Sequence, residues 1–255
     1  MMKNLKTYRQ LFENTQELTP EQIEWLDSCT KGNTWTPGTW TLNPQTGLVD
    51  VKGSFNCSEQ GLTDFKGIRF GVVGLNFECN NNQITSLVGA PQKVGGDFDC
   101  RNNQLTSLVG APQEVGGSFY CYRNQLTSLE GAPQEVGGYF ECHHNQLTSL
   151  KGAPQEVGGY FECHNNQLTS LEGAPQEIGG YFFCRDNPVS EETLKSIFSR
   201  MKKGKSYIQA VETLWNEIPL EDQVLLYRPE FEWVSPEERR KLEAIQAYAG
   251  FKGML

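Results

Sequence analysis

Apolar and polar positions alternate in a short stretch that returns every 21 residues between residues 76 and 187. Each unit begins with Phe-x-Cys, continues through two variable positions to Asn-Gln-Leu-Thr-Ser-Leu, and ends with x-Gly-Ala-Pro-Gln-x-Val-Gly-Gly, with few deviations. Self-similarity at a fixed short period predicts a solenoid, in which the recurring apolar positions face the interior. The cysteines that mark the period are Cys79, Cys100, Cys121, Cys142, Cys163 and Cys184.

One unit is too small to fold alone. Its four larger apolar side chains supply about 6–10 kcal/mol on burial, whereas ordering 21 residues costs about 20–40 kcal/mol. Stability must therefore come from stacking, in which each unit buries the flank of its neighbour and adds backbone hydrogen bonds between units. An apolar content of 37% fits such an array better than ordinary globular domains.

The sequence before the array predicts that residues 1–54 form a helical and β-hairpin cap on the first turn of the solenoid. A helical pattern covers about 5–15, and a second helix begins with Thr19 as N-cap, Pro20 at the first helical position and Gln22 at the third. Apolar residues on both sides of the turn-rich segment 43–47 predict a β-hairpin. A degenerate unit between Cys57 and Cys79 then begins a solenoid of about seven units over residues 55–187.

The consensus fails after Asn187, and residues 188–255 predict a C-terminal helical domain. Helix signals occur from Ser190 to about Lys202, over about 207–215, after Pro219, and from Ser235 to near Gly250. The segment Gly204-Lys205-Ser206 resembles the end of a phosphate-binding loop. Ser199 stands where that loop needs Gly, however, so no phosphate site is predicted.

The thiols are interpreted as core filling. Seven of the eight cysteines share one repeat position among apolar neighbours, and free Cys behaves as a small hydrophobic residue. No CxxC-like cluster of the kind that zinc sites use occurs. No apolar run reaches 18 residues and no signal-peptide pattern opens the chain, so we expect a soluble cytoplasmic protein with reduced cysteines.

Charge is concentrated on the array. Residues 74–187 carry 5 basic and 12 acidic side chains, which accounts for −7 of the net charge of −9. An acidic array repels phosphate and attracts basic surfaces. We therefore expect a protein partner with a basic surface, and neither nucleic acid nor membrane.

The units resemble a known repeat. With Phe161 and Cys163 at its fourth and sixth positions, Asn166 and Leu168 fall at the ninth and eleventh of the leucine-rich consensus LxxLxLxxNxL. The residue sequence of the units is similar to that of leucine-rich repeat proteins of the short type encoded by bacteria and tailed bacteriophages. The resemblance implies an α+β repeat fold, a parallel-β solenoid with its strands on a concave face and an extended convex side. It also implies that a repeated side chain satisfies backbone groups of neighbouring turns, at Asn82, Asn103, Asn124, Asn145, Asn166 and Asn187.

The positions that change from unit to unit are the outward-facing ones around the strand. Parallel neighbours lie about 4.8 Å apart, so the aromatic residues at equivalent positions should form columns. We interpret the second half of this face as a partner-binding surface. The alternative is that cross-strand aromatic pairs only stabilise the sheet, by about 0.2–1 kcal/mol each. The candidate residues are Tyr120, Tyr122, Arg123, Tyr139, Glu141, His143, His144, Tyr160, Glu162, His164, Tyr181, Phe183 and Arg185.

All three histidines, His143, His144 and His164, fall on this face beside Glu141 and Glu162. Such a group could bind zinc or move protons. The favoured interpretation is a set of solvated side chains in a polar contact surface. No metal or cofactor is assigned, and whether the cluster binds a metal stays open.

The most similar enzyme layout is an effector-type ubiquitin ligase, in which an array precedes a helical domain with a catalytic Cys. No Cys follows Cys184 and no His follows His164, so no catalytic residues are assigned. We expect a non-enzymatic binding protein. In a phage it would act in the host cytoplasm and inhibit a host or defence protein. The alternatives are a virion or assembly scaffold component and, more weakly, an acidic DNA-mimic decoy; the oligomeric state stays open.

Overall fold

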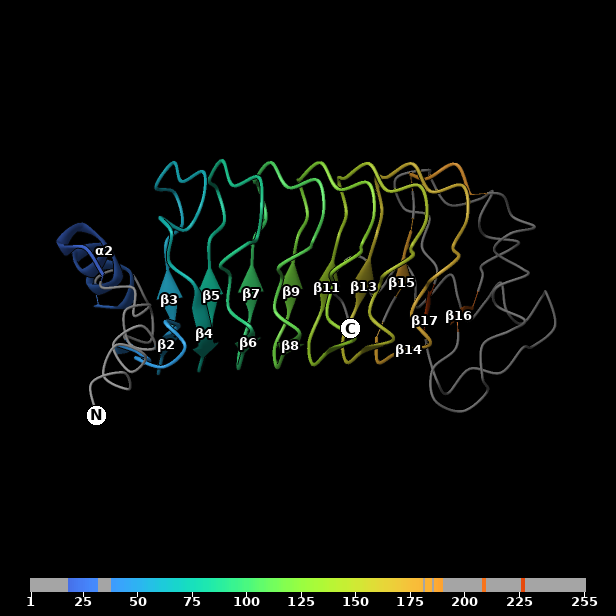
Figure 1. Cartoon of the computed structure of the whole chain (residues 1–255). Coiled ribbons are helices and arrows are strands. Elements are labelled where there is room, and N and C mark those ends of the chain that lie inside the picture. Colours follow the sequence, from blue (N-terminus) through green and yellow to red (C-terminus); the bar gives the residue numbers. More distant parts are fainter. Residues whose placement is uncertain are drawn as a thin grey trace, which may run out of the picture.

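The computed structural model describes residues 18–31, 38–180, 182–184 and 186–189, and the backbone of 208–209 and 226–227. Within these residues the chain forms a parallel-β solenoid preceded by one helix, α2 (Pro20–Lys31) (Figure 1). The helix predicted over 5–15 lies outside the described residues. The strands of the hairpin and solenoid are β1 (Trp40–Leu42), β2 (Val49–Val51), β3 (Phe55–Asn56), β4 (Phe70–Val73), β5 (Phe77–Glu78), β6 (Lys93–Val94), β7 (Phe98–Asp99), β8 (Glu114–Val115), β9 (Phe119–Tyr120), β10 (Glu135–Val136), β11 (Phe140–Glu141), β12 (Glu156–Val157), β13 (Phe161–Glu162), β14 (Glu177–Ile178) and β15 (Phe182–Phe183).

Helix α2 begins with the predicted capping box. The Thr19 backbone N–H donates to Gln22 Oε1 at 2.9 Å, and the Gln22 N–H donates to Thr19 Oγ1 at 3.2 Å. The buried face of the helix presents Trp25, whose ring meets Phe55 edge-on at 5.3 Å between centroids. The helix therefore covers the apolar end of the stack that the first turn would otherwise expose.

The predicted hairpin is confirmed. Strand β1 pairs antiparallel with β2, and the Asn43 side chain accepts backbone hydrogen bonds from Gln45 and Thr46 in the turn between them. Strand β2 then pairs parallel with β4. The hairpin thus supplies the first strands of one solenoid sheet.

Each turn of the solenoid contributes to two parallel sheets. The Phe-x-Cys segments form the seven-stranded Phe-Cys sheet, in the order β15-β13-β11-β9-β7-β5-β3. The second, which we call the Val sheet, contains β4, β6, β8, β10, β12 and β14 after the hairpin. The backbone after the Gly-Ala-Pro segment is therefore extended, as predicted, and it is also paired into a sheet, which the sequence did not predict. In both sheets equivalent residues of successive units are register partners, as for Phe140 and Phe161.

Columns of identical residues fill the space between the sheets. The Phe rings of successive turns stack, with 5.3 Å between the centroids of Phe119 and Phe140 and an interplanar angle of 17°. Burying one such ring contributes about 1.5–3 kcal/mol. Leu, Val and Cys columns complete the core, and every side chain in the Phe and Cys columns is at most 2% exposed.

The Asn of each unit satisfies buried backbone groups, as predicted. Asn145 Nδ2 donates to the carbonyl of Cys121 in the preceding turn at 3.1 Å and to that of Cys142 in its own turn at 3.0 Å. Its Oδ1 accepts from the Leu126 N–H at 3.0 Å. The equivalent pattern recurs at Asn103, Asn124, Asn166 and Asn187.

The Gly-Gly pair forms the corner between the two sheets. A Cβ built on Gly137 would strike the carbonyl oxygen of Gly116, its counterpart in the preceding turn. Only a residue without Cβ allows the backbones to stack this closely. The Gly-Gly repeat is thus explained by steric contact between turns.

The predicted C-terminal helical domain is not supported. Ile208–Gln209 (β16) and Leu226–Tyr227 (β17) form an antiparallel pair, so the helix predicted over 207–215 is wrong at those residues. Both segments combine an aliphatic residue with a neighbouring tyrosine in the sequence, and this composition favours strands when a partner strand is present. The segment after Pro219, also predicted to be helical, contains β17, and the helices predicted from Ser190 and from Ser235 lie outside the described residues. No described helix has the length and apolar character that crossing a membrane requires.

We expect Asn145→Ala to lower the free energy of unfolding by at least about 2 kcal/mol, because each buried backbone group left without its partner costs about 1–3 kcal/mol. Urea titration monitored by circular dichroism measures the change. The matched control is Gln146→Ala, which alters the adjacent exposed side chain. Equal stability of the two variants would contradict the role assigned to the Asn column.

Candidate functional site

The Phe-Cys sheet positions the candidate residues on its outer face. Because side chains alternate along a strand, Phe140 and Cys142 enter the core while Tyr139, Glu141 and His143 project outward. Parallel register then aligns the same positions of neighbouring turns, as Glu141 and Glu162 are aligned across β11 and β13. The variable residues consequently form columns that run along the solenoid.

Tyrosines form the first column. The rings of Tyr139 and Tyr160 stack at 4.9 Å with an interplanar angle of 13°, and Tyr139 is 41% exposed. Each ring lies where a Cβ of the next turn would be, over Gly159 and Gly180 respectively. Phe183 meets the Tyr160 ring edge-on at 6.0 Å. The corner glycines thus make room for a flat aromatic surface.

A second column lies four residues further along each unit, beyond Glu141 and Glu162. His143 is stacked between Tyr122, at 4.3 Å, and His164, also at 4.3 Å, with interplanar angles of 16° and 10°. This stacking leaves the His143 and His164 side chains only 12% and 11% exposed. The imidazoles are therefore largely buried by their neighbours, and they are not the fully solvated groups that the sequence favoured.

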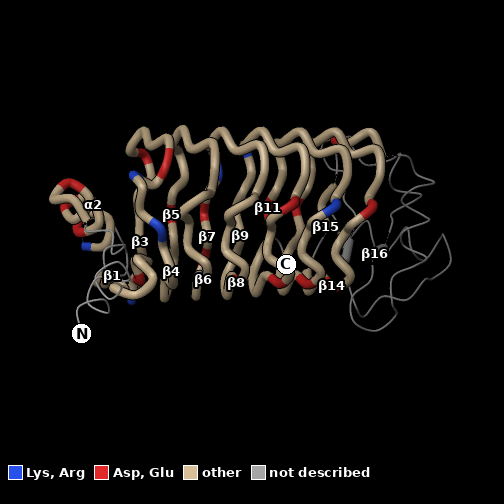
Figure 2. The backbone as a smooth tube through the Cα atoms, in the orientation of Figure 1, with Lys and Arg blue, Asp and Glu red and all other residues tan. Residues whose placement is uncertain are grey.

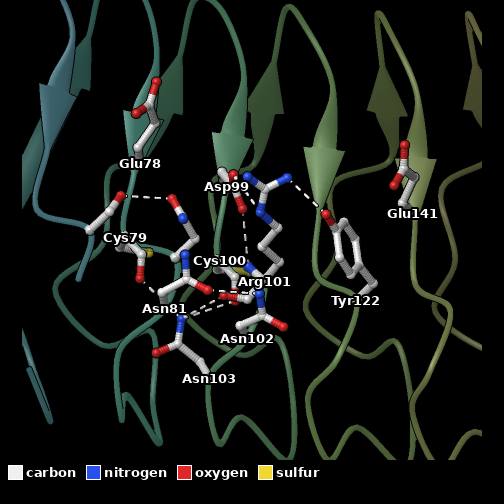
Figure 3. Close-up of polar contacts among 12 residues, drawn as sticks. Glu78, Cys79, Asn81, Asp99, Cys100, Arg101, Asn102, Asn103, Tyr122 and Glu141 are labelled. Atoms are coloured by element: carbon white, nitrogen blue, oxygen red, sulfur yellow. Dashed lines mark hydrogen bonds and ion pairs between the residues drawn. The ribbon is translucent and has the colours of Figure 1, made fainter. Parts of the chain in front are cut away.

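Arg101 extends this column toward the N-terminus (Figure 3). Its Nη1 donates to the Tyr122 hydroxyl at 2.8 Å, and its Nε lies 3.3 Å from Asp99 Oδ2. The Asp99 side chain is only 9% exposed. Burial raises the pKa of Asp99 to about 7, because the nearby Arg101 guanidinium offsets only part of the lost hydration. This carboxyl group therefore titrates near neutral pH.

Two candidate residues occupy a left-handed backbone position. Arg123 and His144 both have φ of 53°. The same position holds Asn81, Asn102 and Asn165 in other turns. Asn and His adopt this conformation more readily than Arg, so Arg123 is the residue that the backbone disfavours.

The Val sheet carries a different chemistry on its outer face. Glu135, Glu156 and Glu177 are register partners, and Glu114 begins the column beside Lys93, with which it pairs. Figure 2 shows that acidic residues outnumber basic ones along the described solenoid. The two sheets therefore present an aromatic face and an acidic face.

Most of the predicted site residues are brought together. Eleven of the thirteen lie on or at the edge of the Phe-Cys sheet, and Tyr181 and Arg185 lie outside the described residues. The sequence prediction missed the Asp99–Arg101 pair, although the spacing of two within one strand was a usable signal. It also missed the Glu column, whose signal was the repeated Gln-Glu-Val before each Gly-Gly pair.

The thiols lie in the core, as predicted. All eight cysteines are free and buried. Burial raises the pKa of Cys142 well above its ordinary value, and the neighbouring members of the column behave in the same way. The buried thiols therefore stay protonated, which suits packing in the core and not nucleophilic chemistry.

No protein-family model matches this sequence, and no curated protein matches it significantly. The interpretation of the site therefore rests on its geometry and chemistry.

We expect the stability of the wild type to depend on pH through Asp99. Its pKa is about 7 in the folded state against an ordinary value of 3.8, so the folded protein binds this proton more tightly. The resulting stabilisation is complete below about pH 4 and is lost as the pH rises to about 7. Asp99→Asn removes the titration, and Asn56 shows that an Asn fits the equivalent position.

Urea midpoints of the wild type and Asp99→Asn, measured between pH 4 and pH 8, check this expectation. The wild type should lose stability relative to the variant as the pH rises through this range. Parallel profiles would show that Asp99 titrates at its ordinary pKa.

Proposed function

We propose that this protein is a non-enzymatic binding module that recognises another protein through the outer face of its Phe-Cys sheet. The observation that carries the proposal is the pair of stacked ring columns, Tyr139–Tyr160 and Tyr122–His143–His164, which stand before and after the strands of the Phe-Cys sheet. Aromatic residues and Arg with a polar surround are the usual content of binding hot spots.

The rigidity of the face supports this proposal. Stacking already orders the rings, and the strands beneath them are fixed by the turn-to-turn hydrogen bonds, such as Cys142 N–H to the Glu162 carbonyl at 2.8 Å. Binding therefore requires little further ordering of side chains, which otherwise costs about 0.5–1.5 kcal/mol for each flexible group. A preorganised aromatic surface suits recognition of a folded partner.

The charges of the face favour a partner with a basic surface. Within the described part of the sheet, the outward acidic residues outnumber Arg101 and Arg123, the two arginines beside them. Complementary charge increases the association rate and excludes acidic partners. The acidic residues are Glu78, Asp97, Asp99, Glu141 and Glu162.

We further propose that the units are of the short leucine-rich type found in bacterial and bacteriophage proteins. The Asn column and the Leu positions of the repeat support this assignment. On that basis the protein would act in a cytoplasm and, when encoded by a phage, would inhibit a host or defence protein. A virion or assembly scaffold component is the alternative; co-purification with particles would favour it.

The Glu column of the Val sheet favours a second candidate, an acidic decoy that imitates DNA. Its charges follow one another at the strand spacing of about 4.8 Å, whereas duplex DNA carries one charge for every ~1.7 Å of its axis. This lower density makes the decoy the weaker candidate. Binding that is lost with added salt but is unaffected by aromatic substitution would support it.

We expect the double substitution Tyr139→Ser with Tyr160→Ser to weaken partner capture strongly. Ser118 occupies the equivalent position one turn earlier, so the variant should remain folded. Affinity capture from a lysate of the native cell, quantified by mass spectrometry, compares the variant with the wild type. Loss of a hot-spot pair should weaken capture by more than about 30-fold, the equivalent of about 2 kcal/mol.

The control is Val109→Glu, which removes an exposed apolar side chain from a turn outside the Phe-Cys sheet. Glu130 occupies the equivalent position in the next unit, so this substitution also has a native precedent. The control should capture the partner as the wild type does. Unchanged capture by the tyrosine variant would overturn the proposal.

A further inference from the structure

Three imidazoles converge in the column that contains Tyr122. His143 and His164 occupy equivalent positions in adjacent turns and stack at 4.3 Å, and His144 meets them edge-on at 5.0 Å and 5.5 Å respectively. One ring nitrogen from each histidine lies within 4.8 Å of the others. The closest pair is His143 Nδ1 and His144 Nδ1, separated by 2.8 Å.

This spacing is close to what a metal ion requires. Two imidazole nitrogens at about 2.0–2.1 Å from a tetrahedral zinc ion are separated by about 3.3 Å. The His143–His144 pair reaches that separation with a movement of roughly half an ångström, and His144 is exposed, so its ring has room to adjust. The third imidazole already lies within reach of the same point.

Glutamates orient two of the rings. His143 Nε2 lies 3.5 Å from Glu141 Oε2, on the side of the ring opposite to the nitrogen that faces His144. His164 Nδ1 lies 3.7 Å from Glu162 Oε2. A carboxylate that accepts the proton of one ring nitrogen fixes the tautomer in which the other nitrogen can bind metal. The Glu141–His143 pair places a carboxylate at ion-pair distance on the side of the ring away from His144.

His144 stands at a backbone position with φ of 53°, in the left-handed region. Asn occupies this position in three other turns, Asn81, Asn102 and Asn165. Asn and His are both among the residues that adopt this conformation more often than others, so either fits the turn. The ring of His144 completes the cluster.

We propose that His143, His144 and His164 form a binding site for a divalent transition-metal ion of the zinc class, with Glu141 and Glu162 as positioning residues. Imidazole ligands suit zinc, copper and nickel rather than magnesium or calcium. Three protein ligands leave a fourth position for water or for a group of a binding partner. The ion would join two adjacent turns at the centre of the aromatic face, and it would do so whether or not that face binds a protein.

The test uses the full chain, prepared without a histidine tag and freed of metal with a chelator. Zn²⁺ is titrated by isothermal calorimetry, and Co²⁺ is added separately to observe the visible absorption of a tetrahedral complex. The wild type should bind one equivalent of Zn²⁺ and show this absorption. Binding to the folded state alone should also raise the melting temperature when Zn²⁺ is added.

The deciding variant is His144→Asn, which installs the residue that three other turns carry at this position. Its matched control is Arg123→Asn, the same replacement one turn earlier. Loss of a ligand should weaken Zn²⁺ binding by more than about 100-fold, beyond the 10–100-fold expected for Glu141→Gln, which changes only a positioning residue. The control should bind as the wild type does.

Both asparagine variants should remain folded and about as stable as the wild type in the absence of metal, because Asn occupies this position in three other turns. Misfolding therefore does not explain a loss of Zn²⁺ binding. A wild type that takes up no more Zn²⁺ than His144→Asn, or a His144→Asn variant that keeps stoichiometric binding, would overturn the proposal.

Discussion

The structure depends on one constraint: the buried backbone groups where each turn bends after its Phe-x-Cys segment must be hydrogen-bonded. The chain bends there beside an apolar core, where an unpaired N–H or carbonyl would be costly. The side-chain amide of Asn145 meets one N–H and two carbonyls of two successive turns. An amide offers two N–H donors and a carbonyl acceptor in one short, uncharged group, whereas a hydroxyl has a single donor. These repeated Asn hydrogen bonds keep every turn in the same register. The aromatic side chains of successive turns are therefore stacked in columns.

The sequence predicted those parts of the fold in which one residue type has one physical role. The capping box of Thr19 and Gln22, the hairpin turn after Asn43, the buried Phe and Cys columns and the Asn column are all confirmed. The strands of the Val sheet were not predicted, because each has a single buried apolar residue, such as Val136 in Glu135–Val136, and so leaves no alternation to recognise. Their pairing arises from stacking between turns, which only the register of the whole array determines.

The candidate site was predicted in outline and not in its electrostatics. Alternation placed Tyr139, Glu141 and His143 on one face, and register placed their counterparts beside them. The burial of Asp99 and of the two stacked imidazoles depends on how far Arg101, Tyr122 and their neighbours lie over one another. A sequence contains no measure of that overlap, so solvated side chains were the natural expectation there.

The one-unit register has an evolutionary consequence. Because equivalent residues of neighbouring turns are partners in both sheets, a new turn inserted between two old ones meets the same surfaces as the turns it separates. Unequal recombination between the nearly identical coding segments can therefore lengthen or shorten the array by whole turns while the core stays intact. The outward positions then diverge turn by turn, and a binding face can change its length and its chemistry through separate genetic events.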